Sequence, residues 1–237
     1  MRALAAASSA CYRTAVSEDP RQVRADRLSR LRGLYAIVGD VEPVRRAEAA
    51  VVGGAGVVQV RMKSSGAGQI LEAARRIVAV ARGRALVLVD DRPDLALLSG
   101  ADGVHVGEED LPVEETRALV GEALLVGRTV RTLDAARAAL AAGADHVGYG
   151  PIFPSGTKPI DVPARGLDAL AETCRGLPAP VVAISGITLE NIEAVAAAGA
   201  AAAAVIGDLF DRGPAQERAA ALAAAFDRGS RMRGGRG

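Results

Sequence analysis

The residues best suited to bind an anion lie in the stretch GPIFPSGTK, residues 150–158. It leaves an apolar run, turns at its prolines and then presents Ser155, the amide of Gly156, Thr157 and the ammonium of Lys158 within four positions. Two hydroxyls, an approachable backbone N–H and a lysine charge suit a phosphate or diphosphate. An ordinary turn followed by a solvated lysine is the alternative, so the rest of the chain must decide between them.

A second polar group lies in VVQVRMK, where Gln59, Arg61 and Lys63 alternate along an expected strand. Alternation places all three on one face. If that face is the interior of a barrel, cations are costly there unless they meet an anion. The alternative is a strand whose end emerges into solvent.

Asp91 and Asp110 each precede a first helical turn that contains proline. Each could therefore be a helix N-cap. The functional interpretation is that two carboxylates from adjacent strand ends hold Mg²⁺, with water and substrate phosphate oxygens completing the coordination shell.

Small residues end the last two expected strands, at Ser185-Gly186 and at Gly207. Backbone amides at these two loops form a phosphate site in many barrels, whereas tight turns that need glycine are the alternative. His105 and His146 lie inside strand patterns, and no Ser or Cys nucleophile is spaced to use them. We therefore interpret both as packed, hydrogen-bonded core residues without a catalytic role.

Short Val/Ile/Leu-rich runs alternate with Ala-rich amphipathic segments from residue 33 onward. Eight such units predict an α/β protein with a single (β/α)8 TIM barrel, and a doubly wound sheet is the alternative. Gly-Ala recurs before strands and suits helix C-caps. We expect strands at 33–39, 57–61, 85–89, 103–107, 124–127, 146–150, 181–185 and 203–207, and helices at 41–52, 69–81, 93–98, 112–120, 133–142, 167–174, 189–198 and 214–226.

In such a barrel the active site lies at the carboxyl ends of the strands. Polar residues follow the expected strands at 59–63, 90–91, 107–110, 128–129 and 155–158, whereas the helix-to-strand turns are mostly Ala, Gly and Pro. The candidate functional residues are therefore expected to lie together at the end of the barrel formed by the carboxyl ends of the strands.

The net charge, the cysteine spacing and the length of the apolar runs exclude several classes of partner and site. The formal net charge of +1 predicts binding to neither nucleic acid nor an anionic membrane surface. The two cysteines have no metal-binding or disulfide-framework spacing, and no apolar run is long enough to span a membrane. We expect a cytoplasmic protein with small-molecule partners; the sequence is compatible with a homo-oligomer and does not decide the oligomeric state.

Both ends of the chain differ from the middle. Residues 1–30 are Ala/Ser/Arg-rich and predict a disordered extension, with a signal or transit peptide as the alternative. The Gly/Arg-rich residues 229–237 are also expected to be disordered. The catalytic domain is then expected at 31–228.

Together these segments resemble the thiamine phosphate synthase family, which includes the thiazole tautomerases. The resemblance runs from about residue 33 to 209 and rests on QVRMK at 59–63, DDRPDLAL at 90–97, GADGVHVGEEDLP at 100–112, GADHVGYGPIFPSGTK at 143–158 and AISGIT at 183–188. It implies a Mg²⁺-dependent transferase that joins hydroxymethylpyrimidine diphosphate to a thiazole phosphate and releases diphosphate.

The resemblance also implies roles for individual residues. Arg61, Lys63 and Lys158 would bind the diphosphate and act in catalysis, and Asp91 and Asp110 would bind Mg²⁺. Gln59, Asp90 and Thr129 would contact the pyrimidine substrate. Ser155, Thr157, Gly186, Ile206 and Gly207 would bind the thiazole phosphate.

The sequence departs from the family pattern at several of these positions. Asp90 replaces a typical Asn, Glu108 a Gln, Thr129 a Ser, Arg131 a His, Ser155 a Thr, Ser185 a Gly and Gly207 a Ser. Asp90 and Glu108 add negative charge beside the expected metal. A thiazole tautomerase-like isomerase and a non-catalytic phosphate-binding barrel are the alternative functions, and whether the thiazole substrate carries a carboxylate is open.

Overall fold

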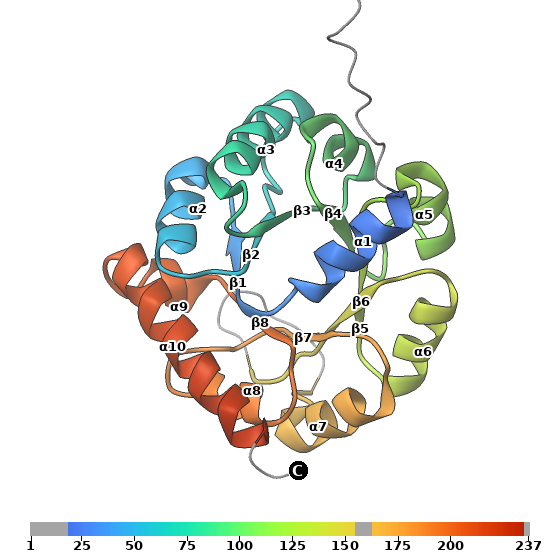
Figure 1. The fold of residues 1–237 in the computed structure, drawn as a ribbon. Helices are drawn as coiled ribbons and strands as arrows, with labels where there is room; N and C mark the ends of the chain where they lie inside the picture. Colours follow the sequence, from blue (N-terminus) through green and yellow to red (C-terminus); the bar gives the residue numbers. More distant parts are fainter. Residues whose placement is uncertain (1–18, 155–162, 235–237) are drawn as a thin grey trace, which may run out of the picture.

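The computed structural model describes residues 19–154 and 163–234. Its eight parallel strands close into a barrel in chain order, and β8 pairs with β1 (Figure 1). The predicted TIM barrel is therefore confirmed, and the doubly wound alternative is wrong. The strands are β1 (Gly33–Val38), β2 (Val57–Val60), β3 (Leu86–Asp90), β4 (Gly103–Val106), β5 (Leu125–Val130), β6 (His146–Tyr149), β7 (Val181–Ala183) and β8 (Ala202–Val205).

Helices surround the barrel. They agree with the predicted helices apart from their ends, except that the short helix α9 was not predicted and begins at Gly207, where a strand end was expected. The predicted helix at 189–198 is shorter because the Asn191 side chain accepts from Thr188 N and donates to the Gly186 carbonyl, which holds these residues in a turn. The surrounding helices are α2 (Pro43–Val52), α3 (Ala67–Ala81), α4 (Pro93–Ser99), α5 (Val113–Val120), α6 (Leu133–Ala141), α7 (Gly166–Gly176), α8 (Ile192–Ala197), α9 (Gly207–Phe210) and α10 (Ala215–Gly234).

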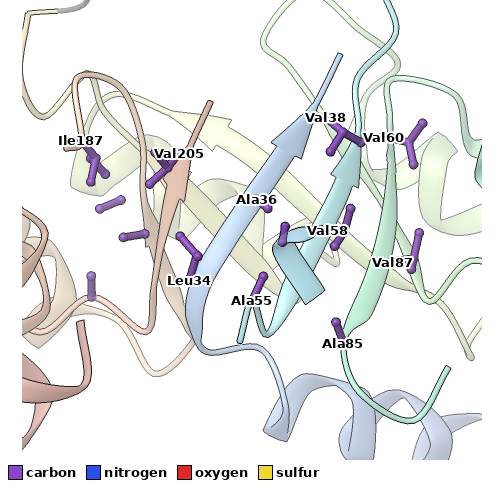
Figure 2. Packing of buried hydrophobic residues seen from close by; sticks show 14 of the residues in the cluster. Leu34, Ala36, Val38, Ala55, Val58, Val60, Ala85, Val87, Ile187 and Val205 are labelled. Atoms are coloured by element: carbon purple, nitrogen blue, oxygen red, sulfur yellow. The ribbon is translucent and has the colours of Figure 1, made fainter. Parts of the chain in front are cut away.

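Alternation along the strands separates two apolar layers. Leu34, Ala36 and Val38 of β1 belong to the large cluster between strands and helices, which Figure 2 shows together with Val58 and Val60 of β2. The intervening residues form a smaller cluster inside the barrel, which contains Tyr35, Val57, Leu86, Leu88, Leu125, Val182, Ala202 and Ala204. Because successive side chains on a strand point to opposite faces, the polar residues in register with this inner cluster also point inward.

Residues 20–29, expected to be disordered, instead form helix α1 (Pro20–Ser29), which crosses one end of the barrel (Figure 1). Asp19 caps the helix by accepting from Arg21 N at 3.0 Å, and proline occupies the first turn. Arg27 donates to the Ala123 carbonyl at 2.9 Å and pairs with Asp102 at 3.0 Å. These contacts with the turns before the strands order the helix.

Residues 229–234, also expected to be disordered, continue α10. Gly229 allows α10 to approach α8 closely, since a Cβ there would lie 2.0 Å from the Glu193 carbonyl oxygen. Arg233 donates to the Gly199 carbonyl at 2.8 Å. Tertiary packing thus overrides the low helical preference of this Gly/Arg-rich sequence. Among the described helices, none is long and apolar enough to cross a membrane.

Candidate active site

A cavity of about 820 Å³ opens at the carboxyl ends of the strands. It lies opposite the end covered by α1. Its charged lining residues are Arg61, Lys63, Asp90, Asp91, Glu108, Glu109, Asp110 and Arg131, and its other lining residues include Tyr35, Gln59, His105, Thr129 and Ser185.

Gln59 of β2 lines this cavity together with Arg61 and Lys63, which follow the end of the strand. The alternative of a strand end that emerges into solvent is partly right, because the side chains of Arg61 and Lys63 are 34% and 47% exposed. Gln59 is only 4% exposed. Arg61 Nε lies 3.2 Å and Lys63 Nζ 3.0 Å from Asp90 Oδ2, and Lys63 also pairs with Asp91. Arg61 and Lys63, two of the cations expected to bind diphosphate, are thus paired with carboxylates.

Asp91 does not cap a helix. The N-cap of α4 is Arg92, without a side-chain capping bond. Asp91 itself has φ 57°, in the left-handed region that non-glycine residues rarely adopt, and its N–H donates to the His105 carbonyl at 2.8 Å. The strained backbone directs this carboxylate to the cavity, and backbone strain of this kind is common at functional sites.

Asp110 does not cap a helix either, because the N-cap of α5 is Pro112. Its Oδ2 accepts from Gly107 N at 2.8 Å within the same loop. A Cβ on Gly107 would lie 2.6 Å from that oxygen, so glycine is needed for the carboxylate to approach. The capping alternatives for both aspartates are therefore wrong.

The charged side chains that line the cavity determine whether it could bind a metal ion. Five carboxylates and three cationic side chains from the described residues line it. Within residues 19–154 and 163–234, no group of three His, Cys, Asp or Glu side chains is arranged to hold a metal alone. Two carboxylates with substrate oxygens would still suit Mg²⁺, which usually keeps waters and binds through one or two carboxylates plus phosphates.

Two contacts connect β4 and β5 at the rim. Arg131 pairs with Glu108 at 2.7 Å, and His105 Nε2 lies 2.9 Å from Thr129 Oγ1. Thr129 thus reaches the cavity as expected, and its closest polar partner is a histidine to which sequence reasoning assigned no role.

Several polar atoms below the rim are buried without a hydrogen-bond partner among the described residues. They are Tyr35 Oη, His105 Nδ1, both ring nitrogens of His146 and Ser185 Oγ. Burial lowers the pKa of His105, and burial followed by its neighbour His105 lowers the pKa of His146 to about 3. The expectation that both histidines are packed is confirmed. His105 is hydrogen-bonded as expected, through Nε2, whereas neither ring nitrogen of His146 has a hydrogen-bond partner among the described residues.

The structure does not bring every predicted residue to the cavity. Gly186, Ile206 and Gly207 are not among its lining residues. Gly186 has φ 69°, and a Cβ there would lie 2.6 Å from the Pro154 carbonyl oxygen, so the turn itself requires glycine. Ser155, Thr157 and Lys158 lie outside the described residues.

Comparisons with known proteins agree with this arrangement. A family model described as thiamine monophosphate synthase matches residues 34–209. The chain belongs to this family. It is 62% identical over 212 residues to the thiamine-phosphate synthase of Anaeromyxobacter dehalogenans, covering 90% of this chain and 96% of the relative. It is 50% identical to that of Myxococcus xanthus over 195 residues, covering 82% and 89%.

A solved structure also supports membership in the thiamine monophosphate synthase family. Thiamine phosphate pyrophosphorylase from Pyrococcus furiosus superposes with a TM-score of 0.78 and 30% identity, covering 85% of this chain and 98% of that one. The expected family and fold are therefore confirmed, whereas the role of each site residue stays a prediction.

Sequence reasoning missed several lining residues of this family member. Strand alternation could have placed Tyr35 inside the barrel. Tyr35 lies two residues before Ile37 and so shares its face of the strand, and Ile37 is in register with Gln59. Ser185, which the sequence places at the end of an expected strand, also lines the cavity, and its φ of 75° fits a position where the family typically has Gly.

Proposed function

We propose that this chain is a thiamine phosphate synthase, a transferase. It would condense 4-amino-2-methyl-5-hydroxymethylpyrimidine diphosphate with 4-methyl-5-(2-phosphoethyl)thiazole, or its carboxylate, to give thiamine phosphate and diphosphate. The observation that carries the proposal is the grouping of Arg61, Lys63, Asp90 and Asp91 in one cavity at the strand ends. Membership in the family supports it.

The cations act on the leaving group. As the C–O bond to diphosphate breaks, its electron pair leaves with the diphosphate oxygen, and negative charge accumulates there. Arg61, Lys63 and Lys158 would stabilise this charge. Lys63 must first exchange its contacts with Asp90 and Asp91 for contacts with the diphosphate.

Asp91 and Asp110 would hold Mg²⁺. When bound, Mg²⁺ would neutralise negative charge on the diphosphate, which the five carboxylates that line the cavity among the described residues would otherwise repel. Gln59, Asp90 and Thr129 would orient the pyrimidine so that its methylene carbon faces the thiazole nitrogen. That nitrogen supplies the electron pair of the new C–N bond, so no protein nucleophile is required.

Ser155, Thr157 and the backbone at Gly186, Ile206 and Gly207 would bind the phosphate of the thiazole. We further propose a cytoplasmic protein with one catalytic domain, which extends beyond the expected 31–228 because α1 and the end of α10 pack on the barrel. No nucleic-acid or membrane partner is needed for this reaction.

A diphosphate-release assay tests the function. The purified chain receives the pyrimidine diphosphate, the thiazole phosphate and Mg²⁺, alone and in combination, and the complete reaction is repeated with EDTA. Release that requires both substrates and metal is the expected result. Conversion of the thiazole phosphate alone would instead indicate an isomerase, and binding without turnover a non-catalytic barrel.

A further inference from the structure

His105 and His146 form a polar layer inside the barrel, directly beneath the candidate site. Their ring centroids are 5.7 Å apart. His146 is fully buried, and His105 lines the cavity. The two histidines therefore lie between the apolar interior of the barrel and the cavity at the carboxyl ends of the strands.

Two glycines on neighbouring strands make room for these rings. A Cβ at Gly127 of β5 would lie 2.3 Å from His146 Nε2 and 2.5 Å from His105 Nδ1. A Cβ at Gly148 of β6 would lie 3.0 Å from His105 Cε1. Because these positions have no side chains, the His105 ring can lie over Gly127 of the neighbouring strand β5 and reach Thr129, two residues further along that strand.

The surroundings of His105 favour one tautomer. The two ring nitrogens of His105 have different neighbours, so an N–H is better satisfied on one of them than on the other. A proton on Nδ1 would be a buried donor with no partner among the described residues. A proton on Nε2 has a hydrogen-bond acceptor, because Thr129 Oγ1 lies 2.9 Å from Nε2.

We propose that His105 is a positioning residue that turns the Thr129 hydroxyl into a hydrogen-bond donor toward the substrate. With its oxygen accepting from His105 Nε2–H, the hydroxyl directs its own proton into the cavity. Its acceptor there is a ring nitrogen or a diphosphate oxygen of the pyrimidine diphosphate. This inference rests on the proposed function, because it assigns Thr129 to that substrate.

A double-mutant cycle tests the inference. His105→Leu and Thr129→Val should each lower kcat/KM for the pyrimidine diphosphate by about tenfold, and the double variant should lose no more than either single variant. A purely structural role for His105 would instead produce an additional loss in the Thr129→Val background. That additional loss would overturn the proposal.

Conservative variants separate positioning from packing. The Gln side chain can place an amide N–H near the position of Nε2, whereas the shorter Asn cannot, so His105→Gln should retain more activity than His105→Asn. If His105→Leu does not fold, these two variants in the wild-type and Thr129→Val backgrounds give the same comparison. Equal activity of His105→Gln and His105→Asn would contradict the proposal.

His146→Leu is the matched control, because it alters the same layer without touching Thr129. It should leave kcat/KM within about twofold of the wild type. A loss as large as that of His105→Leu would overturn the proposal. An active wild type with a fully active His105→Leu variant rejects this inference alone, whereas an inactive wild type rejects the proposed function and this inference with it.

Discussion

Lys63 lies between Asp90 and Asp91 and pairs with both carboxylates. An ammonium held in this way is stabilised but is not free to bind diphosphate. A divalent cation at Asp91 would compete with Lys63 for that carboxylate. Metal binding and the release of Lys63 toward the substrate would then be coupled.

Asp91→Asn tests this coupling. Asparagine tolerates the left-handed backbone at φ 57°, so the fold should be retained while the carboxylate charge is lost. We expect Mg²⁺ stimulation of turnover to fall by about 100-fold, measured as initial rate against Mg²⁺ concentration.

Glu109→Gln is the control for Asp91→Asn, because it removes a negative charge from the same cavity without removing a proposed metal ligand. It should change the Mg²⁺ dependence little. An unchanged Mg²⁺ dependence in Asp91→Asn would exclude Asp91 as a metal ligand.

His146 makes stability depend on pH. Its pKa is about 3 in the folded protein and near 6.5 in the unfolded chain, so below pH 6.5 the unfolded state binds a proton that the folded state does not. Stability therefore falls as the pH drops from about 6.5 toward 3. At pH 5.5 the cost is about 1.4 kcal/mol.

Urea unfolding of the wild type and His146→Leu at pH 7.5 and pH 5.5 measures this contribution. All other titratable groups are the same in both proteins, so the difference between them reports the contribution of His146. The variant should lose less stability between the two pH values. Parallel losses would show that His146 is not held neutral.

At the scale of elements, α1 is joined to the barrel through two Gly-Ala-Asp turns. Asp102 Oδ2 accepts from Val87 N at 2.9 Å, and Asp145 Oδ2 accepts from Val126 N at 2.8 Å. The other oxygen of each carboxylate faces α1, where it pairs with Arg27 at 3.0 Å and with Arg24 at 3.6 Å respectively. Each aspartate thus holds a strand start and the helix together.

Arg24→Ala combined with Arg27→Ala should lower the free energy of unfolding by about 1–2 kcal/mol, because partly buried pairs and a hydrogen bond to Ala123 are lost. Turnover should not change, since the cavity lies at the opposite end of the barrel. Urea midpoints and the diphosphate-release assay measure the two effects.

The control is Arg21→Ala, whose exposed side chain is 3.7 Å from Glu122. It should have almost no effect on stability. A loss of turnover in the Arg24/Arg27 variant at unchanged stability would contradict a structural role for α1.

At the scale of the whole molecule, carboxylates outnumber cations among the described residues that line the cavity, so we expect substrate and metal binding to depend on each other. The pyrimidine diphosphate with Mg²⁺, at about 100 times its Kd, should stabilise the fold by about 2.7 kcal/mol. That corresponds to a rise in Tm of roughly 5–10 °C for a chain of this size.

Thermal melts with the diphosphate alone, Mg²⁺ alone and both together test this interdependence. Each alone should shift Tm much less than the two together, because the diphosphate otherwise meets unneutralised carboxylates. An equal shift without Mg²⁺ would mean that the cations of the cavity suffice.

Much of the fold was predictable from the chain because its signals are local. Strand runs, amphipathic helices and Gly-Ala turns each lie within a few residues, and Gly100 and Gly143 adopt the positive φ that such turns require. The gathering of polar residues at one rim followed from the order of these elements. The sequence by itself thus determined the barrel, the end at which its active site lies, and the alternation of Gln59, Arg61 and Lys63 at and beyond the end of β2.

Only the tertiary structure decided which of these groups meet. The pairing of Lys63 with Asp91, the contact of His105 with Thr129 and the docking of α1 on Asp102 join residues far apart in the chain. Such contacts depend on strand register and on closure of the barrel, neither of which is encoded in a local pattern. For the same reason, Asp91 and Asp110 fit a capping pattern in the sequence and yet point into the cavity in the structure.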